Sequence, residues 1–123
     1  MINAKELRIG NLVDFNGQVE TVYAIRNSGV DFYRGKTKKS VIMQSYLWEA
    51  IKPIKLTEEW LFKFGFKNDR VLEFYRNDFT DSTIIIDYNF ICLLGYSHVK
   101  LKYVHQLQNL YFTLTNEELT LKF

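Results

Sequence analysis

The segment 102–123 constrains the fold of this chain more than any other stretch of the sequence. Apolar side chains recur there at helical spacing, at Val104, Leu107, Leu110, Tyr111 and Leu114. This spacing predicts an amphipathic helix over 104–114. The opposite side of the helix carries amides rather than charges, at Gln106, Gln108 and Asn109. We expect these amides to face the solvent.

The residues after this helix predict a turn and a final strand. Asn116 tolerates the left-handed backbone conformation that often ends a helix. Apolar and polar residues then alternate over 118–123, with apolar side chains at Leu119, Leu121 and Phe123. Alternation with a period of two is typical of a strand that buries one face. We therefore predict a closing strand with these three side chains turned inward.

The N-terminal part of the chain resembles a small antiparallel barrel. The predicted strands span 9–15, 18–26, 30–33 and 40–43. Asn16-Gly17 lies between the first two strands, and this dipeptide is the strongest short-range signal for a β-hairpin. Short strands joined by tight turns are typical of small barrels. The pattern Ile-Gly-Asn-Leu-Val, tight turn, Val-x-x-Val-x-x-Ile resembles the opening of SH3-like barrels.

A helix and a meander are predicted beyond Pro53. Thr57 is suited to cap a helix over 57–64, because its hydroxyl can accept a hydrogen bond from the first turn. Gly65 fits the left-handed position that follows the last turn. Residues 71–103 then show short apolar runs separated by turn residues, which predicts a β-meander. Together these patterns predict an α+β fold.

Length and composition limit the organisation of the chain. At 123 residues with 47% hydrophobic side chains, the chain can bury a sizeable core. We expect one compact unit with a barrel subdomain over 1–52 and an α+β subdomain over 53–123. Cys92 is the single cysteine, which excludes an internal disulfide and favours a buried thiol in the cytoplasm. No apolar run reaches the length of about 20 residues that a membrane span needs.

The strongest candidate for a binding site is a basic loop beside two aromatic residues. The residues concerned are Phe32, Tyr33, Arg34, Lys36, Lys38 and Lys39. Cations next to aromatic rings could hold a phosphate backbone and stack a base. The plainer interpretation is a solvated hairpin loop. A P-loop is excluded, because the glycine that should precede Gly35-Lys36-Thr37 is missing.

The sequence contains no pattern that predicts catalysis, a metal or a cofactor. His98, His105 and Cys92 follow no known ligand spacing, and His105 lies next to the apolar stripe of the final helix. Acidic residues such as Asp78 and Asp81 fall in a predicted turn, where they form local hydrogen bonds. We therefore expect no enzymatic activity. The aromatic content of 16% leaves a homo-oligomeric interface open.

Three segments carry a resemblance to a known group of sequences. They are Lys-Glu-Leu-Arg-Ile-Gly-Asn over 5–11, Ile-Lys-Leu-Thr-Glu-Glu-Trp-Leu-Phe-Lys-Phe-Gly-Phe over 54–66, and Lys-Tyr-Val-His-Gln-Leu-Gln-Asn-Leu-Tyr-Phe-Thr-Leu-Thr-Asn-Glu-Glu-Leu-Thr over 102–120. The chain resembles uncharacterised small accessory proteins of Bacteroidetes phages and prophages. Where such proteins usually carry Leu-Thr-Gly-Glu-Glu-Leu, Asn116 replaces the glycine.

The resemblance implies an accessory protein of a virus or mobile element, and it supplies no catalytic residues. The leading hypothesis is a non-enzymatic protein that binds a host protein or a small signalling nucleotide in the host cytoplasm, as part of a counter to host defence. The alternative is a nucleic-acid-binding module that uses the basic loop 34–39. A net charge of only +2 argues mildly against this alternative. A structural component of the virion is a third interpretation.

Overall fold

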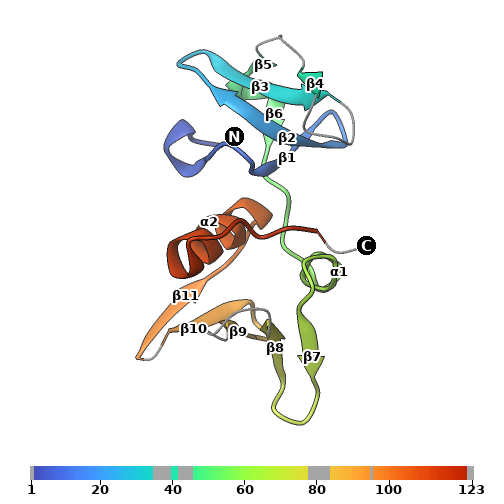
Figure 1. Cartoon of the computed structure of the whole chain (residues 1–123), viewed down its shortest axis with the longest axis vertical. Helices are drawn as coiled ribbons and strands as arrows, with labels where there is room; N and C mark the ends of the chain where they lie inside the picture. Colours follow the sequence, from blue (N-terminus) through green and yellow to red (C-terminus); the bar gives the residue numbers. More distant parts are fainter. Residues whose placement is uncertain (1, 35–39, 42–45, 78–83, 95, 122–123) are drawn as a thin grey trace.

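The computed structural model describes residues 2–34, 40–41, 46–77, 84–94 and 96–121. These residues form two antiparallel sheets and two α-helices, which confirms the α+β class. Helix α2 (Val104–Thr115) lies between the two sheets, and helix α1 (Glu58–Lys63) follows the connector that joins them (Figure 1). No helix in these described ranges is long and apolar enough to cross a membrane.

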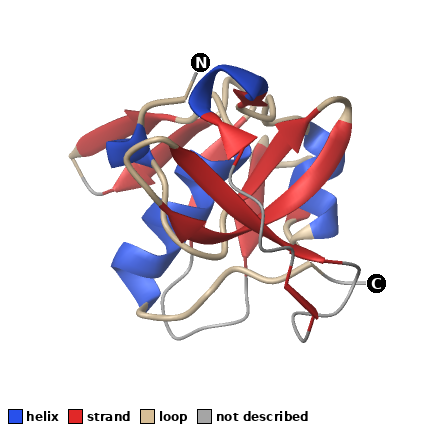
Figure 2. Ribbon diagram, turned by 90° about the horizontal axis from the view of Figure 1, so that it is seen from above, coloured by secondary structure: helices blue, strands red, loops and turns tan. Residues whose placement is uncertain are grey.

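The first sheet is built from the N-terminal part of the chain. Its strands are β1 (Leu12–Phe15), β2 (Gln18–Ile25), β3 (Gly29–Arg34), β4 (Ser40–Val41), β5 (Tyr46–Leu47) and β6 (Ile51–Lys52). Asn16 and Gly17 have φ values of 52° and 81°. Two consecutive positive φ values match the tight hairpin turn that the sequence predicts. Figure 2 shows the strands of this sheet crossing in front of the helices.

The pairing of the first sheet is open rather than closed. The strand order is β4-β3-β2-β1-β6, with β5 also paired to β3, and two short 3-10 helices, η1 (Ala4–Glu6) and η2 (Trp48–Ala50), accompany it. Among the described residues, β4 and β6 do not pair with each other. The closed barrel predicted for 1–52 is therefore not shown, and the supported statement is an antiparallel sheet.

The second sheet is the predicted meander with one additional strand. Its order follows the chain from β7 (Lys67–Asp69) through β8 (Phe74–Asn77), β9 (Ile84–Asp87) and β10 (Ile91–Leu94) to β11 (Ser97–Lys100). Strand β7 was not predicted from the sequence. The meander predicted over 71–103 also starts too early, because Val71 is 91% exposed in the turn before β8.

Helix α1 has the two ends that the sequence predicts. The hydroxyl of Thr57 accepts a hydrogen bond from the backbone N–H of Trp60 at 3.4 Å. At the other end, Gly65 has a φ of 88°, and the N–H of Phe66 donates to the carbonyl of Leu61 at 2.9 Å. This pattern is the Schellman motif, in which a left-handed residue lets the chain close back on the last turn.

The C-terminal tail does not form the predicted strand. Residues 118–121 belong to no strand of the described structure, and 122–123 lie outside the described residues. Leu119 is nevertheless buried, and Leu121 packs against the same core. The alternation in the sequence therefore reflects burial against the core rather than pairing in a sheet.

The amide side of α2 is a contact surface between the two halves, not a solvated face as expected. Gln108 is only 3% exposed. Its Oε1 accepts a hydrogen bond from the N–H of Leu12 at 2.8 Å, and its Nε2 donates to the carbonyl of Gly10 at 3.2 Å. Asn109 likewise donates to the carbonyl of Glu6 and accepts from Asn11.

Two hydrophobic clusters form the core. One lies within the first sheet and includes Val13, Val22 and Phe32. The larger cluster lies around α1, α2 and the second sheet, but it also includes Leu12 of β1. The two halves are thus joined by apolar packing as well as by the amides of α2. The division at 52/53 remains a prediction.

The left-handed residue that ends α2 offers a test of the fold. Asn116 has a φ of 59°, as predicted, and its N–H donates to the carbonyl of Phe112 at 2.8 Å. Asn116→Ala should lower the free energy of unfolding by about 1 kcal/mol, because a Cβ without a local polar partner is strained in this region. Asn116→Gly should leave stability unchanged or raise it. Urea unfolding of both variants measures this, and equal loss in both would contradict the assignment.

Candidate functional site

The basic loop predicted as a binding site is only partly visible. Lys36, Lys38 and Lys39, and the side chain of Arg34, lie outside the described part of the structure. Tyr33 is half-buried and packs edge-on against Tyr23, with ring centroids 5.1 Å apart.

Phe32 requires a correction. It is 1% exposed in the core of the first sheet and cannot stack on a ligand at the surface. Its apolar ring is part of the packing, which the period-two pattern of β3 could have indicated.

The two histidines and the cysteine differ in their surroundings and do not form a common site in the described part of the structure. Cys92 is fully buried, and burial raises the pKa of its thiol to about 11, which keeps it protonated and unreactive at neutral pH. His98 is exposed on the edge strand β11, whereas the side chain of His105 is 0% exposed on α2. The residues in the described ranges form no cluster that could hold a metal ion.

A basic hollow forms where the connector between the sheets passes the start of α2. We call it the lysine hollow; it has a volume of about 280 Å³ and is lined by Lys55, Leu56, Phe90, Lys100, Leu101, Lys102 and Tyr103. The connector pairs with the segment before α2 through an antiparallel bridge between Lys55 and Tyr103. The N–H of Leu56 donates to the carbonyl of Lys102 at 2.9 Å. This pairing gathers lysines that are far apart in the sequence.

The charge around the lysine hollow is uncompensated. Lys55, Lys100 and Lys102 are exposed, and no carboxylate of the described residues forms an ion pair with any of them. The Lys100 ammonium donates only to the backbone carbonyl of Asn89. Three lysines that line one hollow without carboxylate partners give it a positive potential, which favours an anion there.

The start of α2 adds to this positive character. The helix begins at Val104, directly after Tyr103, and its first turn contains no acidic residue. The N-terminal end of a helix carries a partial positive charge, which an acidic side chain often offsets. The helix itself supplies no acidic side chain to offset that charge, although the Glu6 carboxylate lies 3.4 Å from His105 Nε2 in the same turn.

Phe90 lines the same hollow in a strained backbone conformation. It closes the turn between β9 and β10 with a φ of 60°, which is unusual for a bulky residue. Its carbonyl accepts a hydrogen bond from the N–H of Leu101 at 2.8 Å, and its ring stacks at 4° to that of Tyr75. Backbone strain of this kind concentrates at functional sites.

A second hollow lies next to the first and shares Lys100 and Leu101 with it. We call it the histidine hollow; it has a volume of about 360 Å³, and its other lining residues are Lys5, Glu6, Val99, His105, Gln106, Asn109, Leu110 and Thr113. Glu6 Oε2 lies 3.4 Å from His105 Nε2. Burial lowers the pKa of His105, although the Glu6 carboxylate opposes this shift. The imidazole is therefore neutral at pH 7.

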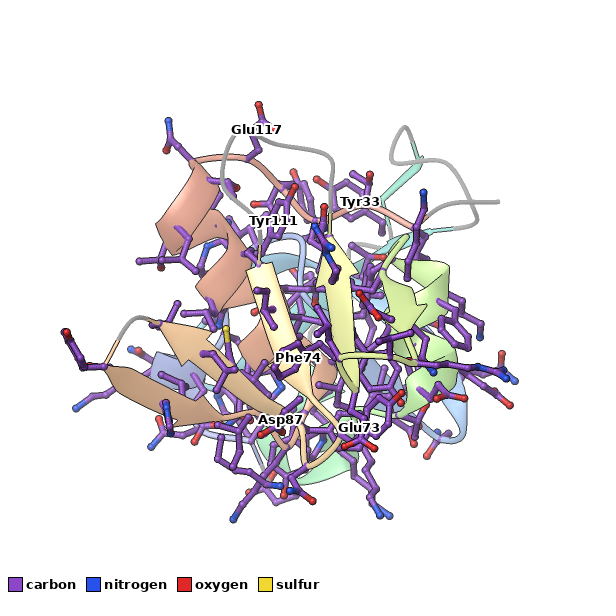
Figure 3. All side chains as sticks on the ribbon, turned by 90° about the horizontal axis from the view of Figure 1, so that it is seen from below. Tyr33, Glu73, Phe74, Asp87, Tyr111 and Glu117 are labelled. Carbon is purple, nitrogen blue, oxygen red and sulfur yellow. The ribbon has the colours of Figure 1, made fainter. Side chains whose placement is uncertain are left out.

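A third hollow is acidic and lies elsewhere. It has a volume of about 300 Å³ and is lined by Phe64, Asn77, Tyr111, Glu117, Glu118, Leu119 and Thr120. Figure 3 shows Tyr111 and Glu117 on the same side of the molecule, away from Asp87 and Glu73 at the opposite side. Glu117 and Glu118 line this hollow and no lysine or arginine of the described residues does, so it does not favour an anionic ligand.

Sequence reasoning missed the lysine hollow because its lysines do not form a run. Lys100 and Lys102 alternate with Leu101 and Tyr103, which was a visible local signal of two cations on one side of the chain. Lys55 joins them only through the bridge to Tyr103. Lys55 and Tyr103 are too far apart in the sequence for the spacing of apolar or charged residues to predict that they pair.

Comparison with family models, with curated proteins and with solved structures finds no significant match to this chain. The geometry and charge of the two adjoining hollows are therefore the observations from which function is inferred.

Proposed function

We propose that the chain is a non-enzymatic accessory protein of a phage or mobile element that binds a small phosphorylated ligand, such as a signalling nucleotide, in the lysine hollow. The observation that carries this proposal is the cluster of Lys55, Lys100 and Lys102 without carboxylate partners. The resemblance to phage accessory proteins supports the setting, the host cytoplasm, and a role in countering host defence. Binding to a host protein belongs to the same hypothesis.

A phosphate group suits the lysine hollow better than other small groups. Each lysine ammonium offers three hydrogen-bond donors and a full positive charge, and phosphate offers several anionic acceptors. Phe90 and Tyr103 add apolar surface on which an organic part of the ligand can lie. No nucleophile paired with a base lines the hollow, which supports binding rather than catalysis.

The alternative function is a nucleic-acid-binding module that uses the loop 34–39. The order of the first sheet, with η2 leading into β6 and β6 paired to β1, supports an SH3-like arrangement for this part of the chain. The burial of Phe32 removes one of the rings proposed to stack a base. The lysine hollow is small, at about 280 Å³, which favours a compact ligand over a nucleic-acid strand.

The proposal predicts a specific loss of binding when the lysines are neutralised. We expect ATP to bind the wild-type protein in a calorimetric titration at low salt. Lys55→Gln combined with Lys102→Gln should weaken ATP binding by at least about tenfold, because two charge-assisted contacts are removed. Both side chains are exposed, so the free energy of unfolding should change by less than about 0.5 kcal/mol for each.

A matched variant separates a local effect from the loss of net charge. Lys52 and Lys67 are exposed and line neither hollow. Lys52→Gln combined with Lys67→Gln removes the same charge and should bind ATP like the wild type. Equal weakening by both pairs, or no ATP binding by the wild type, would overturn the proposed site.

A further inference from the structure

We propose that the ligand spans both hollows, with its phosphate in the lysine hollow and a neutral, hydrogen-bonding ring in the histidine hollow, as a nucleoside 5′-monophosphate would. This inference rests on the proposed function and adds the chemical class of the ligand. The two hollows adjoin, because Lys100 and Leu101 line both of them.

The charges of the two hollows differ in a way that calls for a ligand with two different ends. The lysine hollow is lined by three cations and no carboxylate. The histidine hollow combines Lys5 and the shared Lys100 with the Glu6 carboxylate, and it adds a neutral imidazole and two amides. A second anionic group would meet the Glu6 carboxylate there, which disfavours it. A neutral group with donors and acceptors fits this mixture.

His105 offers polar atoms that the protein leaves without hydrogen bonds. Its side chain is completely buried, Nδ1 has no hydrogen-bond partner, and Nε2 faces only the Glu6 carboxylate at 3.4 Å, without a well-formed hydrogen bond. Buried polar groups of this kind are rare and call for an explanation. A neutral imidazole has one donor and one acceptor, so it can pair with the edge of a heterocycle. The Glu6 side chain is 50% exposed and can move aside to admit such a group.

The wall between the hollows is built to stay rigid. The rings of Tyr103 and His105 are stacked at 8° with centroids 5.7 Å apart. Gln106 Oε1 accepts hydrogen bonds from the N–H groups of Lys102 and Tyr103, which fixes the start of α2. Gln106 Nε2 donates to no acceptor among the described residues, so it is a further donor for a ligand.

Size also favours a ligand that occupies both sites. Pockets for small organic ligands typically measure about 300–1,000 Å³. The two hollows measure about 280 and 360 Å³. The first is just below that range and the second is near its lower end, so each alone suits a phosphate or a single ring rather than a whole nucleotide.

The test compares ligands that share a phosphate but differ in the ring. We would titrate the full chain with ribose 5-phosphate and with AMP, GMP, CMP and UMP. At least one nucleotide should bind about tenfold more tightly than ribose 5-phosphate, which corresponds to one well-formed set of contacts in the second hollow. If all five bind equally, the inference fails while the proposed phosphate site stands. If none binds, the proposed function fails as well.

Two variants and one matched control locate the ring. Thr113 is exposed on α2 and lines the histidine hollow, whereas its neighbour Leu114 is exposed and does not. Thr113→Trp should lower the affinity for the preferred nucleotide to that of ribose 5-phosphate, and Leu114→Trp should not. Glu6→Ala removes the group that covers His105 and should strengthen nucleotide binding without affecting ribose 5-phosphate. If Thr113→Trp is folded by circular dichroism and binds normally, or if Glu6→Ala leaves nucleotide binding unchanged, the ring is not in this hollow.

Discussion

Gln108→Ala should destabilise the protein by about 2–4 kcal/mol, although glutamine is a polar residue on a helix. The side chain is 3% exposed and bonds to both the N–H of Leu12 and the carbonyl of Gly10. Alanine would leave both backbone groups without these partners in a region closed to water, and each unsatisfied group costs about 1–3 kcal/mol. Chemical denaturation of the variant and the wild type measures the difference.

Gln18→Ala is the matched control, because Gln18 is exposed on β2 and forms no such bridge. It should change stability by less than about 0.5 kcal/mol. A loss below about 1 kcal/mol in Gln108→Ala would show that water can replace the amide. In that case the two halves would be held mainly by apolar packing around Leu12.

The sequence predicted the elements that depend on neighbouring residues. The hairpin turn at Asn16-Gly17 and both ends of α1 were assigned correctly, because turn and cap geometries are set within a few residues. The left-handed residue Asn116 was assigned for the same reason. These features require only that the local backbone adopt a conformation that the side chain favours.

The errors concern contacts between distant segments. Gln108 bonds to a residue 96 positions away, and its pattern on the helix looks the same whether the partner is water or a strand. The tail offers a second case, because Leu119 alternates like a strand residue but is buried without pairing. Periodicity shows which side of a segment is buried and does not show what covers it.

The lysine hollow was missed for the same reason, because it depends on contacts between segments that are far apart in the sequence. A run of basic residues over 34–39 is conspicuous in the sequence, but it lies largely outside the described structure. The lysine hollow depends on Lys55 reaching Lys100 and Lys102 through a single bridge at Tyr103. Charge density along a chain is therefore a weaker guide to an anion site than charge density in space.

Leu107→Ala should cause the largest loss among the substitutions considered, about 2–5 kcal/mol, while the same change at Leu114 should have almost no effect. Both leucines lie on α2 and both belong to the apolar stripe of the sequence, but Leu107 is completely buried and Leu114 is 39% exposed. Removing a buried leucine leaves a cavity between tightly packed groups, and the surroundings relax only partly. An exposed leucine loses little when truncated, and alanine favours the helix slightly.

Urea unfolding of the two variants beside the wild type measures this difference with helix propensity held constant. Equal losses in both would mean that Leu114 is covered in solution, as in an interface between copies of the chain, which sedimentation would reveal. A small loss in both would contradict the placement of α2 between the two sheets, because a helix at the surface would not depend on Leu107 in this way.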